Sequence, residues 1–138
     1  MGKSFTGTET MYRDRRTGRI IYAVPGVEYV RPDGRRREGK IEVDVTGWPA
    51  DRLTAFEAKI GELHRLGGEL SFEDVGAGTL VVFLGTLDFD YTSRLCSDDQ
   101  LPEMAVKLIE GLDPEDYVKE LEAYEQSERD PFEADEAY

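Results

Sequence analysis

The sequence predicts an α+β protein with a mainly antiparallel sheet, and three observations carry that prediction. Residues 41–84 predict a strand, a helix and a hairpin of two strands in that order, because their apolar residues change from a strand-like to a helical period and back. Residues 1–40 hold turn signals between apolar runs, which predicts two hairpins. Residues 97–124 hold two further helical patterns. A β-α-β-β order favours a sheet with its helix packed on one face.

The N-terminal hairpins are expected to carry arginine at both tips. Residues 10–14 and 20–24 predict strands on either side of a turn that ends at Gly18, a residue suited to a left-handed bulge position. After a break at Pro25 a second hairpin begins, and its Pro-Asp-Gly sequence at 32–34 is typical of a type I turn. The first tip carries Arg13, Arg15, Arg16 and Arg19, and the second carries Arg31, Arg35, Arg36 and Arg37.

The central strand and helix have the strongest periodicity in the chain. Residues 41–45 alternate apolar and acidic side chains, as in a strand with one buried face. Pro49 is expected in the first helical turn, where its missing N–H needs no partner. The helix should bury one apolar stripe and end at the Gly67-Gly68 pair. The stripe consists of Leu53, Phe56, Ile60 and Leu63, with Phe56 at its middle.

Two strands follow the helix and are expected to pair as a hairpin. Leu70 and Phe72 alternate with polar residues, which predicts a strand with one buried face. The Val-Gly-Ala-Gly sequence at 75–78 predicts the turn. Residues 80–84 form an uninterrupted apolar run, which predicts a strand that is buried on both faces.

The last third of the chain predicts two helices and an acidic tail. Residues 97–100 have the spacing of a capping box, and Asp113 with Pro114 is typical of a second helix start. Residues 125–138 are so acidic and hydrophilic that we expect them to be disordered in isolation. The first helix should bury Leu101, Met104, Ala105, Leu108 and Leu112, and the second should bury Tyr117, Val118, Leu121 and Tyr124.

Length and composition indicate a single domain, residues 1–124, followed by the tail. A chain of 138 residues buries enough surface to fold without a covalent staple. Its single cysteine, Cys96, excludes an intrachain disulfide and favours a reducing compartment. No run approaches the roughly 20 apolar residues that cross a bilayer, and no signal peptide is recognisable. We therefore expect a protein of the cytoplasm or of a virion, without a membrane partner. The lack of asparagine favours a GC-rich bacterial or phage genome.

Charge is distributed very unevenly along the chain. Residues 1–40 hold ten Lys and Arg against five Asp and Glu, a net charge of +5. Residues 41–138 hold seven against 25, a net charge of −18, so the whole chain carries −13. Such a division favours either two different partners or attraction between copies of one protein. The overall negative charge opposes approach to DNA or RNA.

Few side chains offer chemistry other than that of carboxylates. His64 is the only histidine and lies beside the helix stripe, so we interpret it as a boundary residue. Nothing in the spacing of Cys96 and His64 supports a nucleophile with its base. We predict no catalytic residue, no metal and no cofactor. An alternative, a metal-dependent hydrolase or nuclease, depends on two carboxylate pairs on strand faces, Glu42 with Asp44 and Asp88 with Asp90.

We therefore predict a non-enzymatic protein-interaction protein. It would act as a subunit of a homo-oligomeric assembly, such as a phage particle component, or as an acidic inhibitor of a basic partner. In a homo-oligomer, the basic tips of one copy would contact the acidic C-terminal region of the next copy, head to tail. In a nucleic-acid-binding alternative, the same arginines would contact phosphates. The expected partner-binding residues are Arg13, Arg15, Arg16, Arg19, Arg31, Arg35, Arg36, Arg37, Tyr117, Tyr124, Phe132 and Tyr138.

Overall fold

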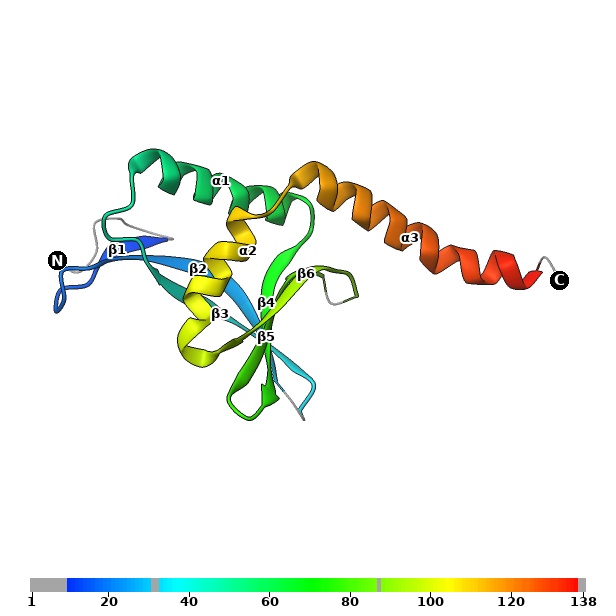
Figure 1. The fold of residues 1–138 in the computed structure, drawn as a ribbon, viewed down its shortest axis with the longest axis horizontal. Coiled ribbons are helices and arrows are strands. Elements are labelled where there is room, and N and C mark those ends of the chain that lie inside the picture. Colours follow the sequence, from blue (N-terminus) through cyan, green and yellow to red (C-terminus); the bar gives the residue numbers. More distant parts are fainter. Residues whose placement is uncertain (1–9, 31–32, 87, 137–138) are drawn as a thin grey trace.

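The computed structural model describes residues 10–30, 33–86 and 88–136, with residues 128–136 described by their backbone alone. Within these residues it confirms the predicted α+β class, with six strands in one mainly antiparallel sheet (Figure 1). The strands are β1 (Met11–Arg13), β2 (Ile20–Val30), β3 (Arg35–Asp44), β4 (Glu69–Gly76), β5 (Thr79–Gly85) and β6 (Asp90–Ser97). The helices are α1 (Ala50–Arg65), the short 3-10 helix η1 (Asp98–Gln100), α2 (Leu101–Glu110) and α3 (Pro114–Glu136).

The sheet is built around β2, which pairs along its whole length with β3. On its other side, β2 pairs with β1 near its beginning and, in parallel, with β4 near its end. Beyond β4 the sheet continues through β5 to β6 by antiparallel pairing. β3 and β6 are therefore outer strands on opposite sides, and no strand of the described residues pairs with their free edges.

The first hairpins form as predicted, except that β2 is not interrupted at Pro25. Gly18 and Gly34 take left-handed backbone conformations in the two turns, with φ of +75° and +71°. Strand β2 runs continuously from Ile20 to Val30. Pro25 is tolerated because its register position falls between the end of β1 pairing and the start of β4 pairing. The N atom of Pro25 lies on the same edge of β2 as that of Ala23, whose N–H donates to the carbonyl of Thr10, and on that edge no strand of the described chain requires a donor from Pro25.

Helix α1 packs on the sheet through the predicted apolar stripe. Phe56, Ile60 and Leu63 are buried, and Leu53 is half-buried against the same core. Pro49 lies one position earlier than predicted, because it is the residue that precedes the first helical turn. The predicted glycine stop also forms, and the chain leaves α1 directly into β4. The helix and the strand that follows it therefore both contribute side chains to the same hydrophobic core.

One prediction about β5 is wrong, because the strand is buried on one face only. Leu80, Val82 and Leu84 are buried beneath the helices, whereas Val81 and Phe83 are half-exposed on the opposite face. Helices α1 and α2 both lie on one side of the sheet, and no element of the described chain covers the other side (Figure 1). We call this uncovered side the open face.

Strand β4 departs from simple alternation for a related reason. Leu70 is buried as predicted, but Ser71 is fully buried and Phe72 is only half-buried. The register places Ser71 in the middle of the open face, between Val27 on β2 and Phe83 on β5. The larger side chains of these neighbouring strands cover the small serine, so its burial could not be predicted from β4 alone.

Helix α2 is anchored as predicted by the capping box before it. The N–H of Ser97 donates to the side-chain oxygen of Gln100 at 3.0 Å. Leu101 and Met104 pack at the edge of the core. Among the described helices, none is both long and apolar enough to cross a membrane. The buried residues of this region are Ala105, Val106, Leu108, Ile109 and Leu112, of which Val106 and Ile109 were not predicted.

Helix α3 differs from its prediction in length and in one buried position. The carboxylate of Asp113 accepts the N–H of Glu115 at 3.1 Å, as expected of an N-cap residue. The helix then continues through residues 125–136, which were predicted to be disordered. Glutamate, alanine and glutamine are good helix formers, so a segment too polar for a core still forms a helix. Val118 was predicted to be buried but is 36% exposed.

Candidate protein-interaction surfaces

Asp14 stabilises the conformation of the turn between β1 and β2, residues 13–19. Its carboxylate accepts the backbone N–H of Arg16 at 2.8 Å and that of Thr17 at 3.3 Å. Its carbonyl accepts the N–H of Gly18 at 2.8 Å. We call these residues the basic tip. An aspartate that closes a turn on its own backbone leaves the neighbouring arginine side chains free to face solvent.

The four arginines of the basic tip have different partners. The guanidinium of Arg13 donates to a backbone carbonyl of the same turn at 2.9 Å. That of Arg19 makes an ion pair with Asp44 at 2.7 Å. Arg15 and Arg16 are exposed and have no ion-pair partner among the described residues. Only Arg19 of the four is paired with a carboxylate in the described chain, so the basic tip keeps three cations, of which Arg13 is hydrogen-bonded within the turn.

Two of the arginines in the second predicted cluster are paired within the chain. Arg36 contacts the carboxylates of Glu69 and, at 3.1 Å, of Glu38. Arg37 makes an ion pair with Glu28 at 3.3 Å. These pairs link β3 to β2 and β4, so the two guanidinium groups support the sheet. Their positive charge is already matched by neighbouring carboxylates.

The rest of the second cluster does not join the basic tip. Arg35 is exposed and has no ion-pair partner in the described part of the chain, and Arg31 lies outside the described residues. The two turns are joined by β2, from Ile20 to Val30. A strand of this length extends for about 33 Å at 3.3 Å per residue. The two predicted clusters therefore cannot hold one small charged group between them.

Helix α3 is the acidic counterpart of the basic tip. Residues 114–136 hold ten Asp and Glu against one Lys and one Arg, a net charge of −8. Only the first part of the helix packs on the body, where Tyr124 meets Phe89 with ring centroids 5.5 Å apart. The remainder runs away from the sheet into open space (Figure 1). Basic tip and helix end lie at opposite ends of the long axis (Figure 1).

The predicted aromatic anchors on α3 are not equivalent. Tyr117 is fully buried, with ring centroids 5.4 Å from Phe89 and 5.2 Å from Tyr91, so it belongs to the core of its own chain. Tyr124 is half-buried. Phe132 lies in the helix at a position described by its backbone alone, and Tyr138 is outside the described residues. Burial leaves Tyr117 without surface to offer a partner.

The open face carries an apolar patch that sequence reasoning missed. Tyr29 and Phe83 stack on it, with ring centroids 5.9 Å apart and an interplanar angle of 9°. Beside them lie Val81 and Leu95, which oppose each other across β5 and β6. Leu95 is 66% exposed. One signal could have revealed it: Leu95 and Cys96 are adjacent in a strand, so only one of them can face the core.

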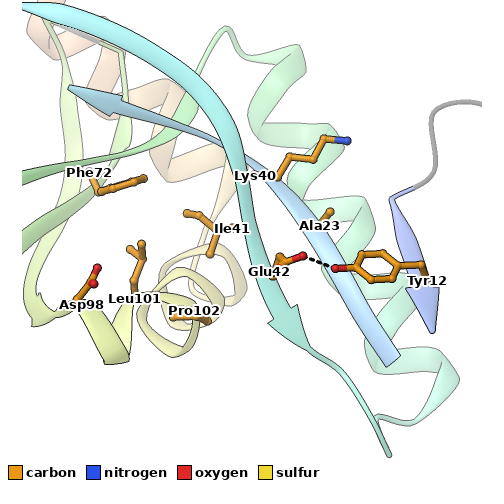
Figure 2. A pocket seen from close by; sticks show the side chains of 9 residues that line it. All are labelled: Tyr12, Ala23, Lys40, Ile41, Glu42, Phe72, Asp98, Leu101 and Pro102. Atoms are coloured by element: carbon orange, nitrogen blue, oxygen red, sulfur yellow. Dashed lines mark hydrogen bonds between the residues drawn. The ribbon is translucent and has the colours of Figure 1, made fainter. Parts of the chain in front are cut away.

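A hollow of about 540 Å³ lies beside β3 and contains polar groups that do not converge (Figure 2). The phenol of Tyr12 donates to the carboxylate of Glu42, and this hydrogen bond is the main cause that raises the pKa of Tyr12 to about 12. Asp98 lies across the strand from this pair, beside Leu101 (Figure 2). The hollow therefore lacks an unpaired set of acid and base groups aimed at one point.

The carboxylates considered for metal chemistry are engaged separately. Asp44 accepts from the hydroxyl and N–H of Thr46 and from Arg19. These hydrogen bonds, the Thr46 hydroxyl first, lower the pKa of Asp44 to about 2. Burial raises the pKa of Asp90, a residue on β6. Across the described residues, no three His, Cys, Asp or Glu side chains gather closely enough to hold a metal ion.

The only thiol and the only imidazole lie in different environments. Cys96 is buried on the core face of β6, and burial, followed by the nearby Asp98, raises the pKa of its thiol. His64 is exposed near the end of α1. A buried thiol with a raised pKa is a poor nucleophile, because the thiolate is the reactive form.

The geometry thus offers three surfaces for interaction, which are the basic tip, the acidic α3 and the open face. All three are formed by exposed side chains or by a projecting helix, and none resembles an enclosed catalytic pocket. No protein-family model matches the sequence, and comparisons with curated proteins and with solved structures return no match.

Proposed function

We propose that the protein is a non-enzymatic subunit of a homo-oligomer, in which the basic tip of one copy contacts α3 of the next. The observation that carries the proposal is the separation of uncompensated charge. Arg15 and Arg16 stand at one end of the molecule, and a helix of net charge −8 projects from the other (Figure 1). One chain cannot bring these ends together, whereas a second copy can. Such a contact is heterologous, so it forms a ring if it closes and a filament if it does not.

Charge alone would not hold this contact. Exposed ion pairs contribute only about 0–1 kcal/mol each. The predicted anchors that remain are Tyr124, Phe132 and Tyr138, because Tyr117 is buried in its own chain. We expect at least one of them to pack on the neighbouring copy, since aromatic side chains dominate the free energy of most protein interfaces.

The first test compares the full chain with a truncation after Gln126, which removes five of the ten Asp and Glu residues of α3, together with Phe132 and Tyr138. Light scattering at about 0.1 M and 1 M salt should show assembly of the full chain that weakens at the higher concentration, where the Debye length falls to about 3 Å. The truncated chain should assemble less at both concentrations. A full chain that remains monomeric at high protein concentration, or a truncation that assembles equally well, contradicts the head-to-tail contact.

The second test reverses charge at the basic tip. The variant Arg15→Glu/Arg16→Glu should lose assembly. The control is Arg35→Glu/Lys40→Glu, which changes net charge equally at exposed positions on β3. Equal loss in both variants would show that net charge, and not the basic tip, governs association.

Two other roles share parts of this evidence. The projecting acidic helix also favours an acidic inhibitor of a basic protein, which would bind its partner as a monomer. The two exposed arginines favour nucleic-acid binding, in which neutralised phosphates release counterions. Truncation after Gln126 separates these roles. It should weaken binding to a basic protein, whereas it should leave or strengthen retention on DNA.

A further inference from the structure

The two outer strands of the sheet are protected very differently. Strand β3 carries charged side chains at seven of its ten positions. Charges of this density on an outer strand discourage pairing with another chain. In β6, by contrast, residues 92–97 include a single charged residue, Arg94. The free edge of β6 is therefore the less charged of the two, and that single charge, Arg94, is in register with the buried Val82 on the helix side of the sheet.

A groove lies beside β6. Tyr91, Thr92 and Arg94 line an open groove of about 300 Å³ between β6, α2 and the beginning of α3. Only β5 pairs with β6 among the described residues. On the open face, Leu95 is 66% exposed, which makes it the most exposed large apolar side chain in the described chain. An apolar side chain this exposed on an outer strand is typical of an interaction surface.

We propose that β6 is a self-association edge, at which two copies pair antiparallel about a two-fold axis beside Leu95. The pairing would join two sheets into one, with the helices of both copies on the same side. Leu95 would lie opposite Leu95 of the second copy on the open face. Ser93 of each copy would lie opposite Ser97 of the other, and Arg94 opposite Cys96. This isologous arrangement closes on itself as a dimer.

Charge and strand geometry disfavour two nearby registers. A register centred one residue earlier would place Arg94 opposite Arg94 of the second copy, and directly opposed like charges destabilise a strand pair. A register centred on Thr92 would cross the irregularity where the pairing passes from Leu84 to Gly85 and Tyr91 has no partner. The Leu95 register avoids both and joins the apolar patches of the two open faces.

This edge is independent of the proposed head-to-tail contact, because it uses neither the basic tip nor α3 beyond its first turns. A protein with both interfaces would be a two-fold dimer that can assemble further through its ends. A protein with the β6 edge alone would stop at a dimer. The two proposals can therefore fail separately.

Disulfide trapping tests the register directly. Under mild oxidation, Leu95→Cys should form a covalent dimer at least about tenfold faster than Val75→Cys, because cross-strand Cβ atoms lie about 4.5–5.5 Å apart. Val75 is 46% exposed at the far end of β4, which makes it a matched control. Ser93→Cys and Ser97→Cys should cross-link efficiently when mixed and poorly when oxidised alone. The wild type controls for the buried Cys96. Equal rates for Leu95→Cys and Val75→Cys overturn the proposal.

A charge on the edge tests the dimer without oxidation. Leu95→Asp should weaken dimerisation by at least about tenfold in sedimentation, whereas Val75→Asp, at another exposed apolar position, should leave it unchanged. Circular dichroism confirms folding, and Leu95→Ser replaces the aspartate if that variant unfolds. Truncation after Gln126 should leave the Leu95→Cys cross-link intact, which separates this edge from the head-to-tail contact. A dimer of full strength in Leu95→Asp overturns the proposal.

Discussion

The ring of Tyr22, on β2, meets the ring of Phe56, on α1, edge-on, with centroids 5.5 Å apart and an interplanar angle of 81°. Both side chains are buried. The phenol of Tyr22 also reaches the carboxylate of Glu57 at 3.3 Å, so the same residue joins the sheet to the helix twice. Burial, followed by the charge of Glu57, raises the pKa of Tyr22 to about 12. This contact fixes the rotation of α1 about its axis.

Phe56→Ala should lower the free energy of unfolding by about 3–5 kcal/mol, because it removes buried surface and leaves a cavity. Glu62→Ala is the control on the same helix, since Glu62 lies outside the apolar stripe and forms an ion pair with Arg65 one turn away. It should cost about 0.5 kcal/mol or less. Urea denaturation measures both, and equal midpoints would show that the assigned face of α1 is wrong.

Adjacent glycines after α1 should respond to alanine for different reasons. A Cβ at Gly68 would lie 2.6 Å from the Tyr117 hydroxyl and 2.7 Å from Leu63, so Gly68→Ala should cost about 1–3 kcal/mol through overpacking. Gly67 has open space but a φ of +80°, so Gly67→Ala should cost about 1 kcal/mol through backbone strain. Tyr117→Ala should rescue Gly68→Ala in part and leave Gly67→Ala unaffected. Absence of that coupling would contradict the packing described here.

The helices and strands could be predicted from local periodicity. In α1, for example, the helical spacing of the apolar residues is enough to predict that Phe56 is buried. Exposure was harder to predict where it depends on distant elements. The apolar run of β5 predicts a strand that is buried on both faces. Phe83 is half-exposed because α1 and α2 both pack on the opposite face of the sheet. Pro25 predicts a break in the strand. It is tolerated because it lies between the part of β2 that pairs with β1 and the part that pairs with β4, and the local sequence does not reveal where those pairings end.

The candidate surfaces were predictable in part. The position of the basic tip followed from its turn sequence. Which of its arginines remain unpaired did not, because Asp44, the partner of Arg19, lies 25 residues away in the chain. Leu95 was missed because a two-residue apolar pair gives no clear period. At both surfaces, contacts between residues distant in sequence therefore determine which side chains remain exposed for a partner.

The Asp44 carboxylate should contribute to acid sensitivity. Its pKa is lowered to about 2, so its stabilising effect is complete above the unfolded value of 3.8 and is lost as pH falls towards 2. Unfolding measured between pH 5 and pH 2 should show a weaker pH dependence in Asp44→Asn. Because the Thr46 hydroxyl is the largest cause, Thr46→Val should flatten the curve more than Arg19→Ala. The slope is the readout, since Thr46 also accepts the N–H of Ile20.

The Cys96 thiol should react slowly in the native protein. It is buried, and burial raises its pKa, so little thiolate is present near neutral pH. Alkylation with iodoacetamide at pH 7.5 should be at least about a hundredfold slower than in urea, where the thiol recovers an ordinary pKa of about 8.5. The Leu95→Cys variant supplies an exposed thiol one residue away as the comparison. Fast native labelling of Cys96 would contradict its place in the core.

The Tyr117 hydroxyl should be dispensable for stability. It is buried without a hydrogen-bond partner among the described residues, and an unsatisfied buried group costs about 1–3 kcal/mol. Tyr117→Phe removes that group and keeps the ring contacts with Phe89 and Tyr91. It should therefore be as stable as the wild type or up to about 1 kcal/mol more stable.

Tyr91→Phe is the matched control for this change, because the Tyr91 hydroxyl donates to Asp116 at 2.8 Å. Loss of that hydrogen bond should cost about 0.5–1.5 kcal/mol. Thermal unfolding of both variants at the same pH compares one unpaired with one paired phenol in the same aromatic cluster. If Tyr117→Phe loses as much stability as Tyr91→Phe, the Tyr117 hydroxyl has a partner, and the junction of α3 with the body is held by a polar contact in addition to its ring contacts.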